Sequence, residues 1–136
     1  MSADLNRTLA AEIAALRALL SGLESERAAL LARDPEAVVQ AAERKSEALR
    51  ALDAGARERA GVALPPKDAA GARLWKELLA LAERGDALNR ENAQLLEAQR
   101  ARTLWALRFL GASAPLYARD GQTGVGNTPS RLFERA

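Results

Sequence analysis

A helical spacing of large apolar residues at the start of the chain is the feature that most constrains its fold. Between Asp4 and Arg33 these residues recur at steps of three or four, with one step of seven, at Leu5, Leu9, Ile13, Leu16, Leu20, Leu23 and Leu30. Residues spaced in this way share one face of an α-helix, whereas a half-buried strand needs alternation at every second position. The spacing therefore predicts a helix over 4–33 with one apolar face.

The composition extends this prediction to the rest of the chain. Ala and Leu together make up 55 of the 136 residues, whereas Val contributes four and Ile one. Ala and Leu are strong helix formers, and strands favour β-branched and aromatic residues. The sequence predicts an all-α fold whose core is thin, because 32 of the apolar residues are Ala.

Proline and glycine divide the helical pattern into three parts. Asp34-Pro35 ends the first helix, because Pro disfavours helical geometry in the residue before it and fits the first position of a new helix, with Asp34 as its N-cap. A second helix is predicted from Glu36 to about Ala60, and Gly61 with Pro65-Pro66 ends it. Its weaker apolar stripe consists of Val38, Val39, Ala42, Leu49 and Leu52.

The third predicted helix is the longest and runs from about Ala69 to Leu110. Its apolar stripe comprises Leu74, Leu78, Leu81, Leu88, Leu95, Leu104, Leu107 and Leu110. Gly85 interrupts the stripe and marks either a bend or a close approach between helices. Asn89 and Asn92 are open to two interpretations. Either they are buried polar residues that fix the register of the helices, or Asn89 is exposed and Asn92 lies at the edge of the seam.

From Gly111 onward, turn-forming residues replace the helical spacing. We therefore predict a helical bundle domain over 1–111 and a flexible, mobile tail over 112–136. Short connections between the helices favour an elongated antiparallel three-helix bundle or hairpin with a long third helix.

The residue types that are missing exclude most enzyme chemistry. The chain contains no Cys and no His, so it has no thiolate nucleophile, no imidazole base and none of the usual zinc or haem ligand sets. We expect no catalytic residue, no metal and no cofactor. Carboxylate pairs such as Glu24 with Glu26, and Glu43 with Glu47, are interpreted as solvated helix faces.

Membrane insertion and nucleic-acid binding are also not indicated. No uncharged run approaches the roughly 18 residues that suggest a membrane span, and the N-terminus does not resemble a secretory signal, so we expect a cytoplasmic protein. The net charge is +2, which by itself does not imply nucleic acid as a partner. Arg100, Arg102 and Arg108 point in several directions around a helix and are interpreted as a solvated face, although nucleic-acid binding stays a third class of function to test.

Large apolar residues are concentrated near the end of the third helix. If Leu104, Leu107 and Leu110 face the core, then Trp105 and Phe109, four residues apart, form a second apolar ridge with no obvious cover. The ridge is either a docking surface or is covered by the tail or by a second subunit. The candidate surface for a protein partner comprises Leu104, Trp105, Leu107, Phe109, Leu110 and Leu116, with nearby Arg residues favouring an acidic partner.

The order and spacing of residues along nearly the whole chain resemble the FlgN-type flagellar export chaperones. In the helical region the resemblance is carried by Leu19-Leu20, Leu23, Glu26, Leu30, Asp34, Lys45, Leu49, Leu52, Trp75, Leu78, Asn89-x-x-Asn92, Leu95-Leu96, Ala106-Leu107 and Leu110. The tail adds Tyr117, Asp120-Gly121 and Arg131. Ala93 departs from the pattern, since the family often has Gly after the second Asn.

The resemblance implies a cytoplasmic, non-enzymatic chaperone. Such a protein binds the C-terminal helical segments of the hook–filament junction proteins FlgK and FlgL, keeps them from polymerising and delivers them to the cytoplasmic domain of the export gate. The C-terminal part of the chain would engage the client, and the role of docking to the export gate would fall on Tyr117. The competing hypothesis is a structural coiled-coil scaffold that buries its ridge by self-association and has no client.

Overall fold

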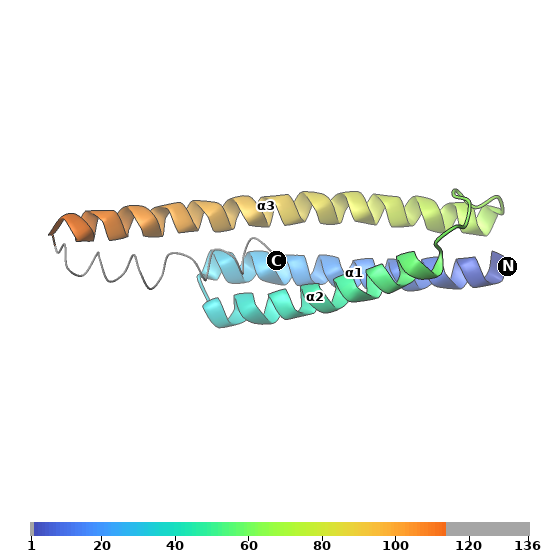
Figure 1. Cartoon of the computed structure of the whole chain (residues 1–136), viewed down its shortest axis with the longest axis horizontal. Coiled ribbons are helices and arrows are strands. Elements are labelled where there is room, and N and C mark those ends of the chain that lie inside the picture. The colour runs from blue at the N-terminus through green and yellow to red at the C-terminus, as the bar shows by residue number, and fades with distance from the viewer. Residues whose placement is uncertain (1, 114–136) are drawn as a thin grey trace. The chain divides into compact units, whose positions relative to one another are not determined.

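The computed structural model describes residues 2–113, with side chains placed over residues 3–110 (Figure 1). This range contains three α-helices, α1 (Ser2–Ala32), α2 (Pro35–Glu58) and α3 (Ala69–Ser113), and no strand. The all-α prediction, with a long third helix, is confirmed. The tail predicted beyond these helices lies outside the described residues from 114 onward.

The chain divides into two compact units at the peptide bond between Asn92 and Ala93, and each is described by itself. The first unit contains α1, α2 and the part of α3 up to Asn92. The second begins at Ala93 and contains the remainder of α3.

A tight turn joins α1 to α2 as the Asp34-Pro35 pair predicts. The N–H of Asp34 donates to the carbonyl of Ala29 at 3.0 Å, and the N–H of Arg33 donates to that of Leu30 at 3.2 Å. Together with the positive φ of 53° at Arg33, these bonds form a Schellman motif that satisfies the last carbonyls of α1. Asp34 then caps α2, its Oδ1 accepting from the N–H of Ala37 at 3.2 Å.

The face that α1 buries follows a regular spacing of three and four residues. Every member of this seam is buried, charged residues included: Leu9, Glu12, Leu16, Leu19, Leu23, Glu26 and Leu30. Such alternation is the heptad spacing of coiled-coil packing. It brings Leu9, Leu16, Leu19 and Leu23 into one hydrophobic core with Ala48 and Leu78.

The apolar stripe predicted for α2 is wrong in part, because Val39 and Leu49 are 56% and 46% exposed. The residues that α2 buries are smaller or charged: Ala41, Lys45, Ala48 and Gly55. Small residues let the two backbones approach closely. A Cβ placed on Gly22 of α1 would lie 3.6 Å from the backbone N of Lys45.

The first part of α3 runs parallel to α1 and antiparallel to α2. Ion pairs between α1 and α3 advance together along both helices, from Arg17 with Glu77 to Arg27 with Glu91, whereas contacts with α2 run in the opposite sense (Figure 1). Within the first unit this arrangement confirms a three-helix bundle. Leu78 supplies the buried α3 contribution to its core, and Leu74, Trp75, Leu81 and Leu88 pack against it while partly buried.

Two buried glycines face α1 with different amounts of space. A Cβ added to Gly55 would lie 2.4 Å from Cγ of Glu12, whereas one added to Gly85 meets only Cδ2 of Leu20, at an ordinary contact distance of 3.7 Å. Gly55 thus makes room for the buried Glu12 side chain. Gly85 is buried against α1, but the space beside it would accept a Cβ, so the contact with Leu20 does not itself require glycine.

These contacts predict opposite effects for the same substitution. Gly85→Ala should raise the free energy of unfolding by up to about 1 kcal/mol, since Ala is the better helix former and fits the space. Gly55→Ala should lower it by about 1–3 kcal/mol through overpacking. Urea denaturation followed by circular dichroism measures both, and equal effects of the two changes would contradict this description of the interface.

Asp68 caps α3 and ties its start to the start of α1. Its Oδ2 accepts from the N–H of Gly71 at 3.0 Å and from Nδ2 of Asn6 at 3.2 Å. Both donors stabilise the carboxylate, and they hold the pKa of Asp68 below its ordinary value of 3.8, with the backbone donor as the larger cause.

The lowered pKa predicts a contribution to stability that depends on pH. It is fully present above the ordinary Asp pKa and is lost as the pH falls through the lower value in the folded protein. Asp68→Asn keeps an oxygen that can cap the helix but removes this titration. Between neutral pH and about pH 3, the variant should therefore lose less thermal stability than the unmodified chain, and an identical loss in both would contradict the assigned role.

Candidate functional site

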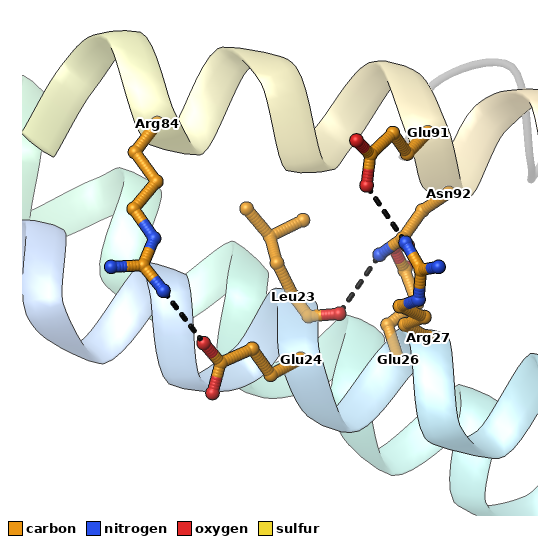
Figure 2. A network of polar contacts seen from close by, with 7 residues as sticks. All are labelled: Leu23, Glu24, Glu26, Arg27, Arg84, Glu91 and Asn92. Carbon is orange, nitrogen blue, oxygen red and sulfur yellow. Dashed lines mark hydrogen bonds and ion pairs between the residues drawn. The ribbon is translucent and has the colours of Figure 1, made fainter.

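A buried polar cluster links the three helices near the end of the first unit. Lys45 of α2 lies 3.3 Å, Nζ to Oε2, from Glu26 of α1. Asn92 of α3 donates through Nδ2 to Glu26 Oε1 at 3.0 Å and to the carbonyl oxygen of Leu23 at 2.8 Å (Figure 2). Glu26, Lys45 and Asn92, which we call the polar cluster, are 8%, 5% and 2% exposed.

The polar cluster fixes how the helices align. A buried charge without a partner is strongly destabilising, so sliding one helix past another by a turn would separate groups that cannot be left unpaired. For Asn92, the structure supports the interpretation of a register device. Asn89 is exposed, and its Oδ1 accepts from Lys45 Nζ at 3.5 Å.

The expectation that Glu26 lies on a solvated face is wrong. Glu26 stands three residues after Leu23 and four before Leu30, which places it on the buried seam of α1. Its neighbour Glu24 is exposed and lies 3.6 Å from Arg84, beside the pair of Arg27 and Glu91 at 2.7 Å (Figure 2). These outer pairs are solvated and contribute little stability.

A second polar contact, which the sequence analysis missed, joins the other end of α2 to both of its neighbours. Arg59 donates through Nε to Oε2 of the buried Glu12 at 2.8 Å. The same guanidinium lies over the ring of Trp75, 5.4 Å from its centroid, within the range of a cation–π interaction. The seam spacing of Glu12, three residues after Leu9 and four before Leu16, is the signal by which it could have been found.

The polar cluster predicts that removing one charge is worse than removing both. Lys45→Met leaves Glu26 buried without its cation and should cost about 3–5 kcal/mol of unfolding free energy. Adding Glu26→Leu should recover much of this loss, because an apolar pair replaces a buried ion pair at little net cost. Urea denaturation of both variants measures the difference, and a double variant no more stable than the single one would contradict the role given to the pair.

In the second unit, α3 exposes a dense group of large apolar residues. All residues from 101 to 110 are exposed. Five of them, which we call the apolar turn, are large and apolar: Leu104 (44% exposed), Trp105 (68%), Leu107 (37%), Phe109 (65%) and Leu110 (53%). The indole and phenyl rings of Trp105 and Phe109 are stacked, with centroids 5.8 Å apart and planes inclined by 18°.

Leu104, Leu107 and Leu110 do not face the core, which was the condition for a separate ridge of Trp105 and Phe109, since all three are exposed. The seam of α3 alternates steps of four and three from Leu74 through Leu78 to Asn92. Continued at this spacing, it reaches positions 95, 99, 102, 106 and 109, so that these leucines fall outside it. Two other predicted site residues, Leu116 and Tyr117, lie outside the described residues.

Positive charge surrounds the apolar turn. Arg100 lies 3.9 Å from Glu97 in an i,i+3 pair. Arg102 and Arg108 make no ion pair within residues 3–110. A partner with carboxylates would therefore find cations free to bind it.

The described residues expose large apolar side chains at the apolar turn. Over residues 2–113 there is no cluster of three metal-ligating side chains, and no helix is long and apolar enough to cross a membrane. A shallow groove where α1 meets α2 is lined mainly by alanines, including Ala28, Ala32 and Ala41. Exposed apolar area of the kind found on the apolar turn marks sites of protein interaction.

Comparison with known families agrees with this description. The model of the FlgN protein family matches residues 1–124. The chain belongs to the FlgN family. FlgN proteins are flagellar export chaperones, a family of chaperones and not of enzymes, so the predicted resemblance is confirmed. Searches of curated proteins and of solved structures gave no match to this FlgN-family chain.

Proposed function

We propose that this chain is a cytoplasmic chaperone for the hook–filament junction proteins FlgK and FlgL. It covers their C-terminal helical segments with the apolar turn, keeps them from polymerising and delivers them to the cytoplasmic domain of the flagellar export gate. The exposure of all five members of the apolar turn is the observation that carries this proposal.

The chemistry of the apolar turn suits the capture of an amphipathic helix. Segments of this kind bind by laying an apolar face against a partner's apolar surface. Trp and other large side chains dominate the energetics of such interfaces, because they bury much area with few rotatable bonds. The stacked pair of Trp105 and Phe109 supplies such an anchor.

Two further residues belong to this proposal. Leu116, from the apolar residues near the end of the helix, would extend the client surface, and Tyr117, from the family resemblance, would dock the loaded chaperone at the export gate. Separate groups for client and gate would let a chaperone present its cargo without first releasing it.

The proposal predicts that the aromatic pair is needed for binding a client. Trp105→Ala combined with Phe109→Ala should weaken binding of the C-terminal segment of a junction protein from the same organism by about tenfold or more. Helicity should stay largely intact, because both side chains are exposed. Titration calorimetry measures the affinity, and the unmodified complex should show one-to-one binding with a negative heat-capacity change.

A matched control uses exposed leucines in the first unit. Leu31→Ala with Leu79→Ala, at positions 61% and 49% exposed, should leave the affinity unchanged. Equal affinities for the aromatic variant and the unmodified chain would contradict the placement of the surface. Sedimentation of the chain alone tests the scaffold alternative, which requires a tight oligomer at low micromolar concentration.

A further inference from the structure

The apolar turn covers more of the circumference of its helix than one partner helix can bury. Each residue of an α-helix is rotated by about 100° from the one before it. Leu104, Leu107 and Leu110 therefore form one face, the leucine face, and Trp105 and Phe109 form another, the aromatic face. The midlines of the two faces lie about 180° apart around the helix, whereas one contact with a neighbouring helix takes an apolar stripe of about 100° or a little more.

We propose that the client presents two helices to the apolar turn, one against each face. This inference rests on the proposed function and specifies the form of its partner. With both faces covered, α3 becomes the central helix of a bundle that is completed by the client.

The distribution of charge identifies the kind of helix that fits the aromatic face. Arg102 and Arg108 lie three residues before and three after Trp105, which places them on opposite edges of that face. Neither pairs with a carboxylate within the described residues. The helix that covers Trp105 and Phe109 is therefore an acidic one, with Asp or Glu along both of its edges.

The same charges argue against a second copy of the chain as the occupant. Two copies packed through their aromatic faces about a two-fold axis would bring like charges together, Arg102 and Arg108 from each. Like charges placed together at an interface cost several kcal/mol. Arg102 and Arg108 therefore attract an acidic client segment, whereas they repel the same residues of a second copy.

Calorimetry with separate variants of each face tests the two-helix contact. The probe is the C-terminal segment of the junction protein, titrated into the full chain. Leu107→Ala with Leu110→Ala removes much of the leucine face, and Trp105→Ala with Phe109→Ala removes the aromatic face. Each variant should weaken binding by about tenfold or more, while the control of Leu31→Ala with Leu79→Ala leaves it unchanged.

A charge reversal tests the acidic helix. Arg102→Glu with Arg108→Glu should weaken binding by about tenfold or more and make the affinity less sensitive to salt. Arg50→Glu with Arg73→Glu makes the same change in net charge at exposed positions of the first unit and should have little effect. Circular dichroism of every variant verifies that the helices are retained.

The outcomes separate this inference from the proposed function. Loss of affinity on one face alone would overturn the two-helix contact and leave the chaperone function standing. An unchanged affinity and salt dependence after the reversal at Arg102 and Arg108 would overturn the acidic helix. Failure of the unmodified chain to bind the segment would overturn the proposed function, and this inference with it.

Discussion

The buried contact between Lys45 and Glu26, completed by Asn92, is the interaction on which the arrangement of the helices depends. Apart from Lys45, the residues that α2 buries are small, namely Ala41, Ala48 and Gly55, and small residues pack almost equally well at neighbouring registers. A charge pair 3.3 Å apart is different, because it is satisfied at one alignment only. The polar cluster therefore fixes the register of α2, which the small residues of that helix leave open.

Close approach of the helices and burial of charge support each other in this bundle. Gly55 leaves room for Glu12, and Arg59, the C-cap residue that follows α2, pairs with it. Larger residues on the α2 seam would separate the helices and let water reach the carboxylates. The small side chains of α2 therefore allow the close packing that keeps these ion pairs buried.

Residues that build the bundle and residues offered to a partner follow different patterns along α3. Up to Asn92 its apolar residues keep the seam spacing, and Leu78, Gly85 and Asn92 are buried. Around Arg102 the seam position is charged, and the leucines that follow stand outside it. Leucines that lie outside the seam positions of their own helix are available for contact with another protein.

Sequence reasoning recovered the elements whose causes are local. The spacing from Leu5 to Leu30 gave α1, and the Asp34-Pro35 pair gave the turn and the cap of α2. The prediction of buried residues failed where burial depends on which helix packs against them. Glu26 and Lys45 are buried only because each meets the other, and the exposed Leu49 looked as suitable for a core as the buried Ala48.

The candidate site was recovered in part for the same reason. The spacing of Trp105 and Phe109 predicted that they lie together on one face of the helix, because residues four apart are neighbours, and in the structure their rings are stacked. From the sequence, Leu104 fits both the apolar stripe of the helix and the candidate surface for a partner, and only knowledge of the seam shows that it is exposed. Conversely, the family assignment depended on order and spacing across the whole chain and needed no knowledge of burial.

Fluorescence of Trp105 tests the central claim, that a client covers the apolar turn, most directly. The chain has two tryptophans, so Trp75→Phe leaves Trp105 as the only indole. Trp105 is 68% exposed, and its emission should shift to shorter wavelength when a saturating amount of the junction-protein C-terminal segment is added. An unchanged emission in a complex shown by calorimetry to have formed would contradict the claim.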